Sequence, residues 1–215
     1  MVVHSPETSS AVQRTHAVTA SRRPIFSSLQ HIGNAIYGLR NVELSDEWAP
    51  MMRTWLSDSE QLLRAEGISF KDTISILQSL LLVSYNPRIA FLKGIEKWGL
   101  RQQFDEVVNE AWIVFDMALK ALPSNGYRSR SERKHAEKII ESCQSLPGSL
   151  VATNEYLFGF ECDVVMRSSG DGYTKITDYE IDGIHHRQIT KKHFCRLRDE
   201  YLKTRGVKVI RKIVA

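Results

Sequence analysis

One short stretch combines residue types that could do chemistry. Residues 178–186 read DYEIDGIHH, which is three carboxylates followed by a glycine and two histidines. Side chains alternate between the two faces of a strand, so Asp178, Glu180 and Asp182 are expected to point the same way. Clustered carboxylates repel one another unless a cation neutralises them. The candidate cations are Mg²⁺, which prefers oxygen ligands, and the Lys and Arg side chains of the segment that follows.

A further carboxylate can join this cluster from the preceding strand. Asp163 lies in CDVVM, and the SSGDG segment at 168–172 is a hairpin turn signal. Strand pairing would bring Asp163 close to Glu180 and Asp182. Such a set could bind Mg²⁺ through Asp163 and Glu180 and hydrolyse a phosphodiester, with Asp163, Glu180 and Asp182 as catalytic candidates. Two alternatives stay open: an acidic site that positions nucleic acid, and a polar strand end that has no ligand.

The C-terminal segment carries the positive charge of the chain. From Arg187 to Ala215 there are ten Lys and Arg against two acids, whereas the whole 215-residue chain has a net charge of +4. This density is typical of proteins that bind a phosphate backbone, and a solvated helix face is the alternative. The candidate nucleic-acid contacts are His186, Lys191, Lys192, Arg196, Arg198, Lys203, Arg205, Lys208 and Arg211.

Two regions must position these residues. Apolar residues three and four apart begin a helical region at Leu29, and further helices are predicted over 46–66, 70–85, 100–122 and 128–145. Beyond 149 the order is strand, turn, strand, basic helix and strand. We therefore expect an α+β protein, with an all-helical region over 25–147 and a small α/β domain over 149–215.

Three other features narrow the class of protein. Residues 1–24 are rich in Ser, Thr and Arg, a composition typical of an organelle transit peptide or of a disordered tail. Cys143, Cys162 and Cys195 are scattered, which favours a reducing compartment and argues against a zinc knuckle or a disulfide framework. The longest apolar run is too short and too polar to cross a membrane.

The C-terminal motif resembles a known domain. YEIDGIHH, the basic helix after it and RGVKVIR resemble the RAP domain, a module named as an RNA-binding domain abundant in apicomplexans. RDEYLKTRGVKVIR is also similar to the closing helix and strand of very-short-patch-repair-type endonucleases, a branch of the PD-(D/E)XK nuclease fold. The resemblance covers residues 149–212 and implies a restriction-endonuclease-like fold. Its matched positions are Asp163, Glu180, Asp182, Gly183, His186, Leu202, Gly206 and Val209.

Two departures from the nuclease pattern disfavour catalysis. A working nuclease of this fold usually has a lysine two residues after its strand glutamate, and this chain has Asp182 at that position. The endonuclease-like relatives often carry an aspartate three residues before the helix arginine, where this chain has Cys195. A Mg²⁺-dependent PD-(D/E)XK-type nuclease therefore remains as the alternative to a binding protein.

The helical region carries a second resemblance. LQHIGNAIYGLRNV (29–42) is similar to the helical repeats associated with RAP domains in algal and protist proteins. RAP proteins with helical regions act mostly on organellar RNA. The resemblance thus implies binding of organellar rRNA or mRNA, in RNA processing, stability or ribosome assembly or structure, with ribosomal or other ribonucleoprotein subunits as partners. A mitochondrial location is expected, with a plastid or another reducing compartment as the alternative.

Overall fold

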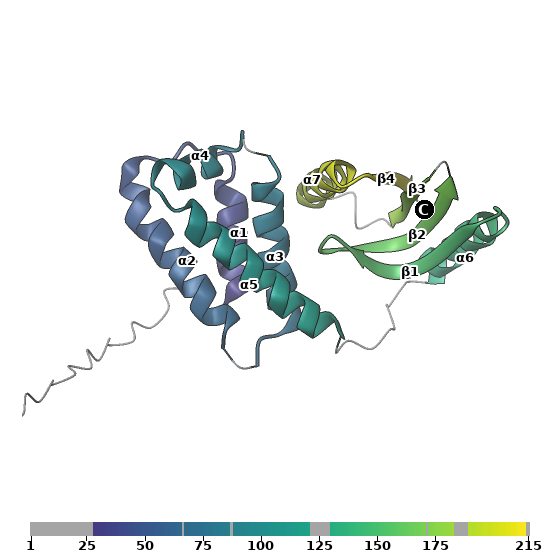
Figure 1. Ribbon diagram of the computed structural model, residues 1–215, viewed down its shortest axis with the longest axis horizontal. Helices are drawn as coiled ribbons and strands as arrows, with labels where there is room; N and C mark the ends of the chain where they lie inside the picture. The colour runs from purple at the N-terminus through teal and green to yellow at the C-terminus, as the bar shows by residue number, and fades with distance from the viewer. Residues whose placement is uncertain are drawn as a thin grey trace, which may run out of the picture.

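A helical bundle and a four-stranded sheet with two flanking helices make up the protein (Figure 1). The computed structural model describes residues 28–65, 67–86, 88–120, 130–170, 172–182 and 189–213. The architecture is mixed α+β with most of its helices in the N-terminal part, as the sequence predicts. The bundle contains α1 (Leu29–Leu39), η1 (Asp46–Trp48), α2 (Ala49–Leu63), α3 (Phe70–Ser84), α4 (Ala90–Lys97) and α5 (Arg101–Lys120).

Helix α1 and helix α3 form the tightest pair of the bundle. Each begins at a serine N-cap: Ser28 accepts a hydrogen bond from the His31 N–H, and Ser69 accepts one from the Asp72 N–H. The apolar stripe of α1 packs on α3 at the point where α1 has Gly33. A Cβ atom there would lie 3.1 Å from the Ser75 carbonyl oxygen, so the glycine allows the two backbones to approach.

The predicted helices differ from the observed ones in two places. The segment predicted as one helix over 46–66 begins as a short 3-10 turn, and α2 starts at Ala49 with Pro50 in its first turn, where proline is tolerated. Helix α4 was not predicted at all. Its eight residues are too few for a periodic pattern to stand out, yet Phe91, Leu92 and Ile95 are fully buried.

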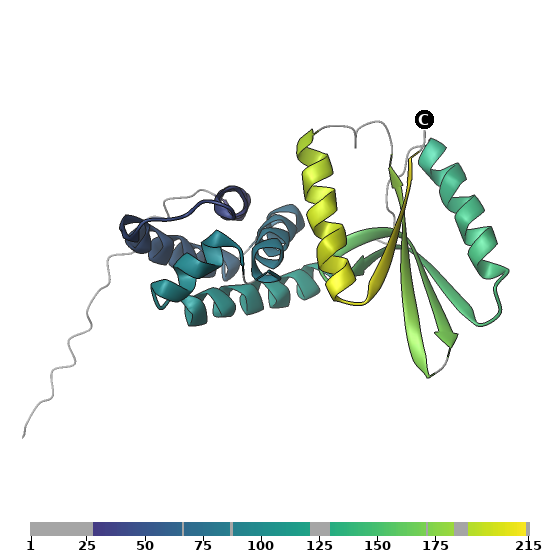
Figure 2. The ribbon, with the colours of Figure 1, turned by 90° about the horizontal axis from the view of Figure 1, so that it is seen from above.

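The sheet is mixed and lies between two helices (Figure 2). Strands β1, β2 and β3 pair antiparallel in chain order, and β4 pairs parallel to β3 after the crossover through α7. Helix α7 covers the face toward the bundle, and α6 covers the other face. The elements are α6 (Arg130–Gln144), β1 (Ser149–Leu157), β2 (Phe160–Gly170), β3 (Tyr173–Asp182), α7 (Ile189–Thr204) and β4 (Val207–Ile213).

Helix α6 packs with the sheet. Its sequence predicts a place in the helical region over 25–147, but its contacts are with β1, β2 and β3. Ala136 of α6 forms a small apolar cluster with Val164 and Ile181 on this face of the sheet. The charged residues of α6 remain on its outer side, which is why its sequence reads as an exposed helix.

A hairpin turn splits the first predicted strand into β1 and β2. Phe158 and Gly159 both have positive φ, at 51° and 86°, as a two-residue type I′ turn requires. The turn was missed because its residues are not the polar ones that usually mark a loop. It packs onto α3: Gln78 Nε2 donates a hydrogen bond to the Gly159 carbonyl oxygen at 3.1 Å.

Replacing Gly159 with alanine should destabilise the protein more than the same replacement at a glycine that has positive φ but no close neighbours. A Cβ atom at this position would lie 2.8 Å from Leu81 Cδ1, in a backbone conformation that L-residues avoid. We expect the free energy of unfolding to fall by about 2–3 kcal/mol in urea denaturation. Gly99→Ala is the matched control, since Gly99 has φ +67° but open space around it. Equal losses in the two variants would contradict the packing argument.

The bundle and the sheet share one continuous hydrophobic core. Tyr201 and Leu202 of α7 and Phe160 of β2 belong to the same buried cluster as the bundle helices. The ring of Tyr201 meets the rings of Tyr85 and Phe160, with centroids 6.0 and 5.4 Å away. Within the described residues, no helix combines the length and the apolar character that spanning a membrane requires.

Candidate functional site

The three carboxylates of β3 lie together on the face covered by α7. Asp178, Glu180 and Asp182 are only 0, 5 and 8 % exposed, so this end of the strand is a buried acidic cluster and not a solvated one. The prediction that they share a face is confirmed, because Asp178 and Glu180 contact one arginine and Glu180 and Asp182 contact another. Burying this much negative charge requires compensation.

Arg198 of α7 supplies the first compensating charge. Its Nη1 donates to Glu180 Oε2 at 2.8 Å, and its Nη2 lies 2.7 Å from Glu180 Oε1, so this pair is bidentate. Nη2 also donates to Asp178 Oδ2 at 2.9 Å. The guanidinium reaches these atoms from the apolar stripe of the helix, and Arg198 as a whole is 8 % exposed.

Arg211 of β4 supplies the second charge. Its Nη1 donates to Asp182 Oδ1 at 2.7 Å and lies 3.9 Å from Glu180 Oε2. Its Nε and Nη2 donate to the two carboxylate oxygens of Asp199 at 2.7 and 2.8 Å. Arg211 therefore links β3, β4 and α7, and it directs an acidic residue of α7 away from the outer face of that helix.

Two carboxylates facing one guanidinium titrate differently. The pKa of Asp178 is raised to about 8, because burial and the charge of Glu180 raise it by more than the charge of Arg198 lowers it. Burial also acts on Glu180, but the hydrogen bond and charge of Arg198 hold its pKa below the ordinary value. The pair is thus expected to keep one proton, on Asp178, at neutral pH.

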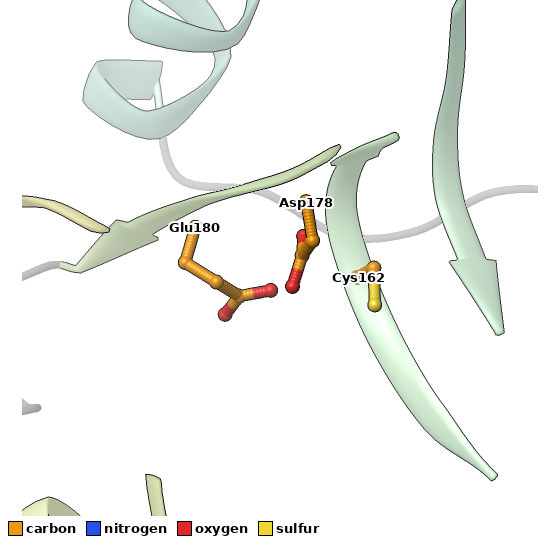
Figure 3. A group of neighbouring side chains, drawn as sticks. All are labelled: Cys162, Asp178 and Glu180. Carbon is orange, nitrogen blue, oxygen red and sulfur yellow. The ribbon is translucent and has the colours of Figure 1, made fainter. Parts of the chain in front are cut away.

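A cysteine of β2 completes this group (Figure 3). The Cys162 sulfur and one oxygen each of Asp178 and Glu180 lie within 4.8 Å of one another, and the two carboxylates turn toward each other. This set does not fit a metal ion, because Arg198 already donates to both carboxylates. Burial also raises the pKa of the Cys162 thiol, which disfavours the thiolate form that a metal binds.

Asp163 has a structural role at the same place. Its Oδ2 accepts a hydrogen bond from the Ile181 N–H at 2.7 Å, and its own N–H donates to Glu180 Oε1 at 3.4 Å. These bonds continue the β2–β3 connection beyond Val164, where the backbone register begins. Cys162 faces the main core and Val164 faces α6, although strict alternation would put them on one side. The strand therefore changes faces around Asp163.

The pair predicted as Mg²⁺ ligands, Asp163 and Glu180, is thus brought together as the sequence predicts. However, Asp163 is engaged with the backbone of β3, and Glu180 is bound by Arg198. Mg²⁺ prefers several oxygen ligands and keeps waters of its own, and a guanidinium in contact with the same carboxylate opposes it. The residues of this cluster fit arginine neutralisation better than Mg²⁺.

The predicted nucleic-acid contacts separate into two groups. Arg198 and Arg211 point inward and serve the acidic cluster. His186 falls among residues outside the described part of the chain, as does the side chain of Lys191. The remaining members of the predicted set have exposed side chains on or next to α7 and β4: Lys192, Arg196, Lys203, Arg205 and Lys208.

Stacking on RNA bases requires an accessible aromatic ring, and three aromatic residues of β3 and α7 differ in that respect. Tyr173 is 65 % exposed at the start of β3. Tyr179 packs in the small cluster under α6, and Phe194 packs against Tyr37 and Phe160. Only the first of these three therefore offers an accessible ring face.

A cavity of about 210 Å³ adjoins the acidic cluster. Its lining mixes charges of both signs. The lining residues are Asp182, Lys192, Cys195, Arg196, Asp199 and Arg211.

The inward position of Arg198 has a signal in the sequence, although Arg198 is among the residues predicted to contact nucleic acid. Arg198 lies three and four residues from Tyr201, Leu202 and Phe194, so it occupies the apolar stripe of α7. A cation on that stripe faces the core, and the carboxylates of the preceding strand are the partners that it would meet. The sequence does not single out Arg211 in the same way. Strand β4 is short, and Lys208 and Lys212 are cations in the same strand, so no pattern indicates which of the three faces the acidic cluster.

Replacing Asp178 with asparagine should remove one contribution to the pH dependence of the free energy of unfolding. Since the pKa of Asp178 is raised from 3.8 to about 8, the folded protein binds a proton that the unfolded chain has lost between these values. Stability from this group is therefore complete below about pH 4 and is lost as the pH rises toward 8. Asparagine mimics the protonated acid, so the stability of Asp178→Asn should rise relative to that of wild type between about pH 4 and 8. Parallel stability curves across this range in urea denaturation would contradict the assignment.

Comparison with known proteins gives no match for this chain. No protein-family model matches it, and no match is found among curated proteins or solved structures.

Proposed function

We propose that this chain binds RNA through the exposed cations of α7 and β4. The observation that carries the proposal is that the basic residues of this segment fall into a buried pair and an exposed set. Arg198 and Arg211 neutralise the buried acids, and the other described cations of the segment remain exposed. These exposed cations are Lys192, Arg196, Lys203, Arg205, Lys208 and Lys212.

The outer face of α7 is suited to a phosphate backbone. Lys192, Arg196 and Lys203 are spaced so that they lie along one side of the helix. Asp199, which falls on the same side, is turned to Arg211 by two hydrogen bonds, and that pairing offsets its charge. Exposed cations of this kind release counterions when they contact phosphates.

The choice of RNA rests on the resemblance to the RAP domain. The order β2, β3, α7 and β4 is the strand, strand, helix and strand order of the resembling segment. We propose a restriction-endonuclease-like RAP fold for this unit on that basis, and a role in processing, stability or ribosome assembly of organellar RNA. A mitochondrial location extends the proposal, supported by the composition of residues 1–24, which lie outside the described part of the chain.

A Mg²⁺-dependent nuclease has weaker support. Hydrolysis at Asp163, Glu180 and Asp182 would require these carboxylates to hold a metal ion near the phosphodiester. Two of them are instead bound by Arg198 or Arg211, and the third holds the backbone of β3. Their geometry is that of a structural cluster, which supports binding without turnover.

The test is a combined assay of binding and cleavage on purified protein. Labelled single-stranded RNA, structured RNA and DNA are incubated with and without Mg²⁺ or Mn²⁺ over a series of salt concentrations. We expect RNA binding that weakens linearly in log Kd against log salt, with intact RNA recovered at every metal concentration. Metal-dependent cleavage that is lost in Glu180→Ala would replace the binding proposal with the nuclease. Absence of binding at low salt would refute both.

A further inference from the structure

Three side chains from the bundle and from α7 meet at the junction of the two units. Arg40 follows the last residue of α1, and its Nη2 contacts His193 Nε2 of α7 within hydrogen-bonding distance. On the other side of the imidazole, Arg196 Nη2 lies 3.3 Å from His193 Nδ1. One histidine is thus held between two guanidinium groups that come from opposite ends of the described chain.

This arrangement has more donors than acceptors. A guanidinium only donates hydrogen bonds, and a neutral imidazole has one acceptor nitrogen and one N–H. Only one of the two contacts of His193 can therefore be a hydrogen bond, and in the other contact two donors face each other. If His193 is protonated, neither contact is a hydrogen bond and three positive charges adjoin. Either state favours an acceptor of negative charge at this point.

The nearby acceptors do not satisfy this need. Arg40 Nη1 donates to the Tyr37 carbonyl oxygen at 2.6 Å, which leaves Nη2 directed at His193. Arg196 lies 3.8 Å from Glu200, a loose pair with exposed side chains, and Glu200 also accepts a hydrogen bond from Tyr85. Exposed pairs of this kind contribute little and are easily exchanged for another anion.

A buried hydroxyl lies at the same junction. The Tyr37 Oη atom is buried and has no hydrogen-bond partner among the described residues. Its ring lies under the Arg40 guanidinium at 4.1 Å and packs against Phe194. Burial raises the pKa of Tyr37, while the positive charges of Arg40 and Arg196 act in the opposite direction. The hydroxyl therefore remains a neutral donor.

We propose that Arg40, His193 and Arg196 form a site for a phosphate group, with Arg40 contributed by the bundle. Guanidinium groups are the preferred protein ligands of phosphate, because their fork of N–H donors matches its oxygens. The source of the phosphate rests on the proposed RNA binding: a backbone phosphodiester would engage this site together with the outer face of α7. The helical bundle would then be part of the nucleic-acid interface and not only its support.

The test uses the full chain and two probes, inorganic phosphate and a single-stranded RNA oligonucleotide. Imidazole resonances are followed by NMR during phosphate titration of wild type, Arg40→Gln, Arg40→Lys and the control Arg133→Gln, whose exposed arginine lies on α6. We expect phosphate to shift the His193 signals in wild type and in the control. The response should be lost in Arg40→Gln and partly kept in Arg40→Lys. Thermal unfolding of each variant verifies that it is folded.

The outcomes separate this site from the proposed function. A His193 signal that does not respond to phosphate, or that responds equally in Arg40→Gln, overturns the site. A response that depends on Arg40, with RNA affinity reduced about fivefold or more in Arg40→Gln, supports a phosphodiester as the ligand. The same response with unchanged RNA affinity supports the site for free phosphate and removes it from the RNA interface. Failure of wild type to bind RNA refutes the proposed function, while the phosphate response still decides the site.

Discussion

Arg198→Leu is expected to lower the free energy of unfolding by about 3–5 kcal/mol, the largest effect of any single substitution considered. The leucine would fit the apolar stripe of α7, but it would leave Glu180 charged and buried with Arg211 at 3.9 Å as its nearest cation. Asp178 would lose its hydrogen bond from Nη2 as well. The measurement is urea denaturation of the purified variant, followed by circular dichroism and tryptophan fluorescence.

Lys203→Leu is the matched control for this substitution. It also replaces a cation of α7 with leucine, but Lys203 is exposed. A change within about 0.5 kcal/mol is expected there. Adding Asp178→Asn and Glu180→Gln to Arg198→Leu should recover part of the loss, because no unpaired charge then remains in the core. A loss of unfolding free energy below about 1 kcal/mol for Arg198→Leu alone would contradict the prediction, because it would mean that water solvates the carboxylates or another cation neutralises them.

Neutralising the outer face of α7 is expected to have the largest effect on RNA binding. In the combined variant Lys192→Gln, Arg196→Gln and Lys203→Gln, the slope of log Kd against log salt should decrease by about 2 for single-stranded RNA. Affinity at low salt should fall on the order of tenfold to a hundredfold. The side chains are exposed, so the stability of the fold should change little.

A control with the same change in net charge uses α6. Arg133, Lys134 and Lys138 are exposed on that helix, on the opposite side of the sheet. Their combined replacement with glutamine should leave the salt slope near that of wild type. If both triple variants lose affinity equally, binding depends on total charge and not on the α7 face.

The elements of the C-terminal unit could be predicted because their patterns are local. The hairpin signal at 168–172 and the alternation through Asp178, Glu180 and Asp182 depend on residues close in sequence. The structure pairs β2 with β3 antiparallel, as the hairpin signal predicts, but Ser168, Ser169 and Gly170 belong to β2. It also places the three carboxylates on one face. The type of cation that neutralises the cluster could not be decided in this way. That choice depends on how α7 is rotated against the sheet, which the packing of Tyr201 and Leu202 determines.

Contacts between distant segments were beyond the reach of such patterns. The Arg40–His193 pair joins residues 153 positions apart, and neither residue lies in a sequence motif that would predict the other as its partner. The turn at Phe158 and Gly159 was missed for a related reason. Apolar residues are acceptable in a tight turn only because the tip packs onto α3, a fact that no local sequence window contains.

The distance along the chain between α1 and α7 also bears on synthesis. At translation rates of about 5–20 residues per second, the 153 positions between Arg40 and His193 correspond to a delay of roughly 8–30 s. Until α7 is synthesised, the sides of the Tyr37 and Tyr85 rings that contact Phe194 and Tyr201 are uncovered. The nascent bundle would thus display an apolar surface to the ribosome exit region, where a chaperone could bind it until α7 emerges.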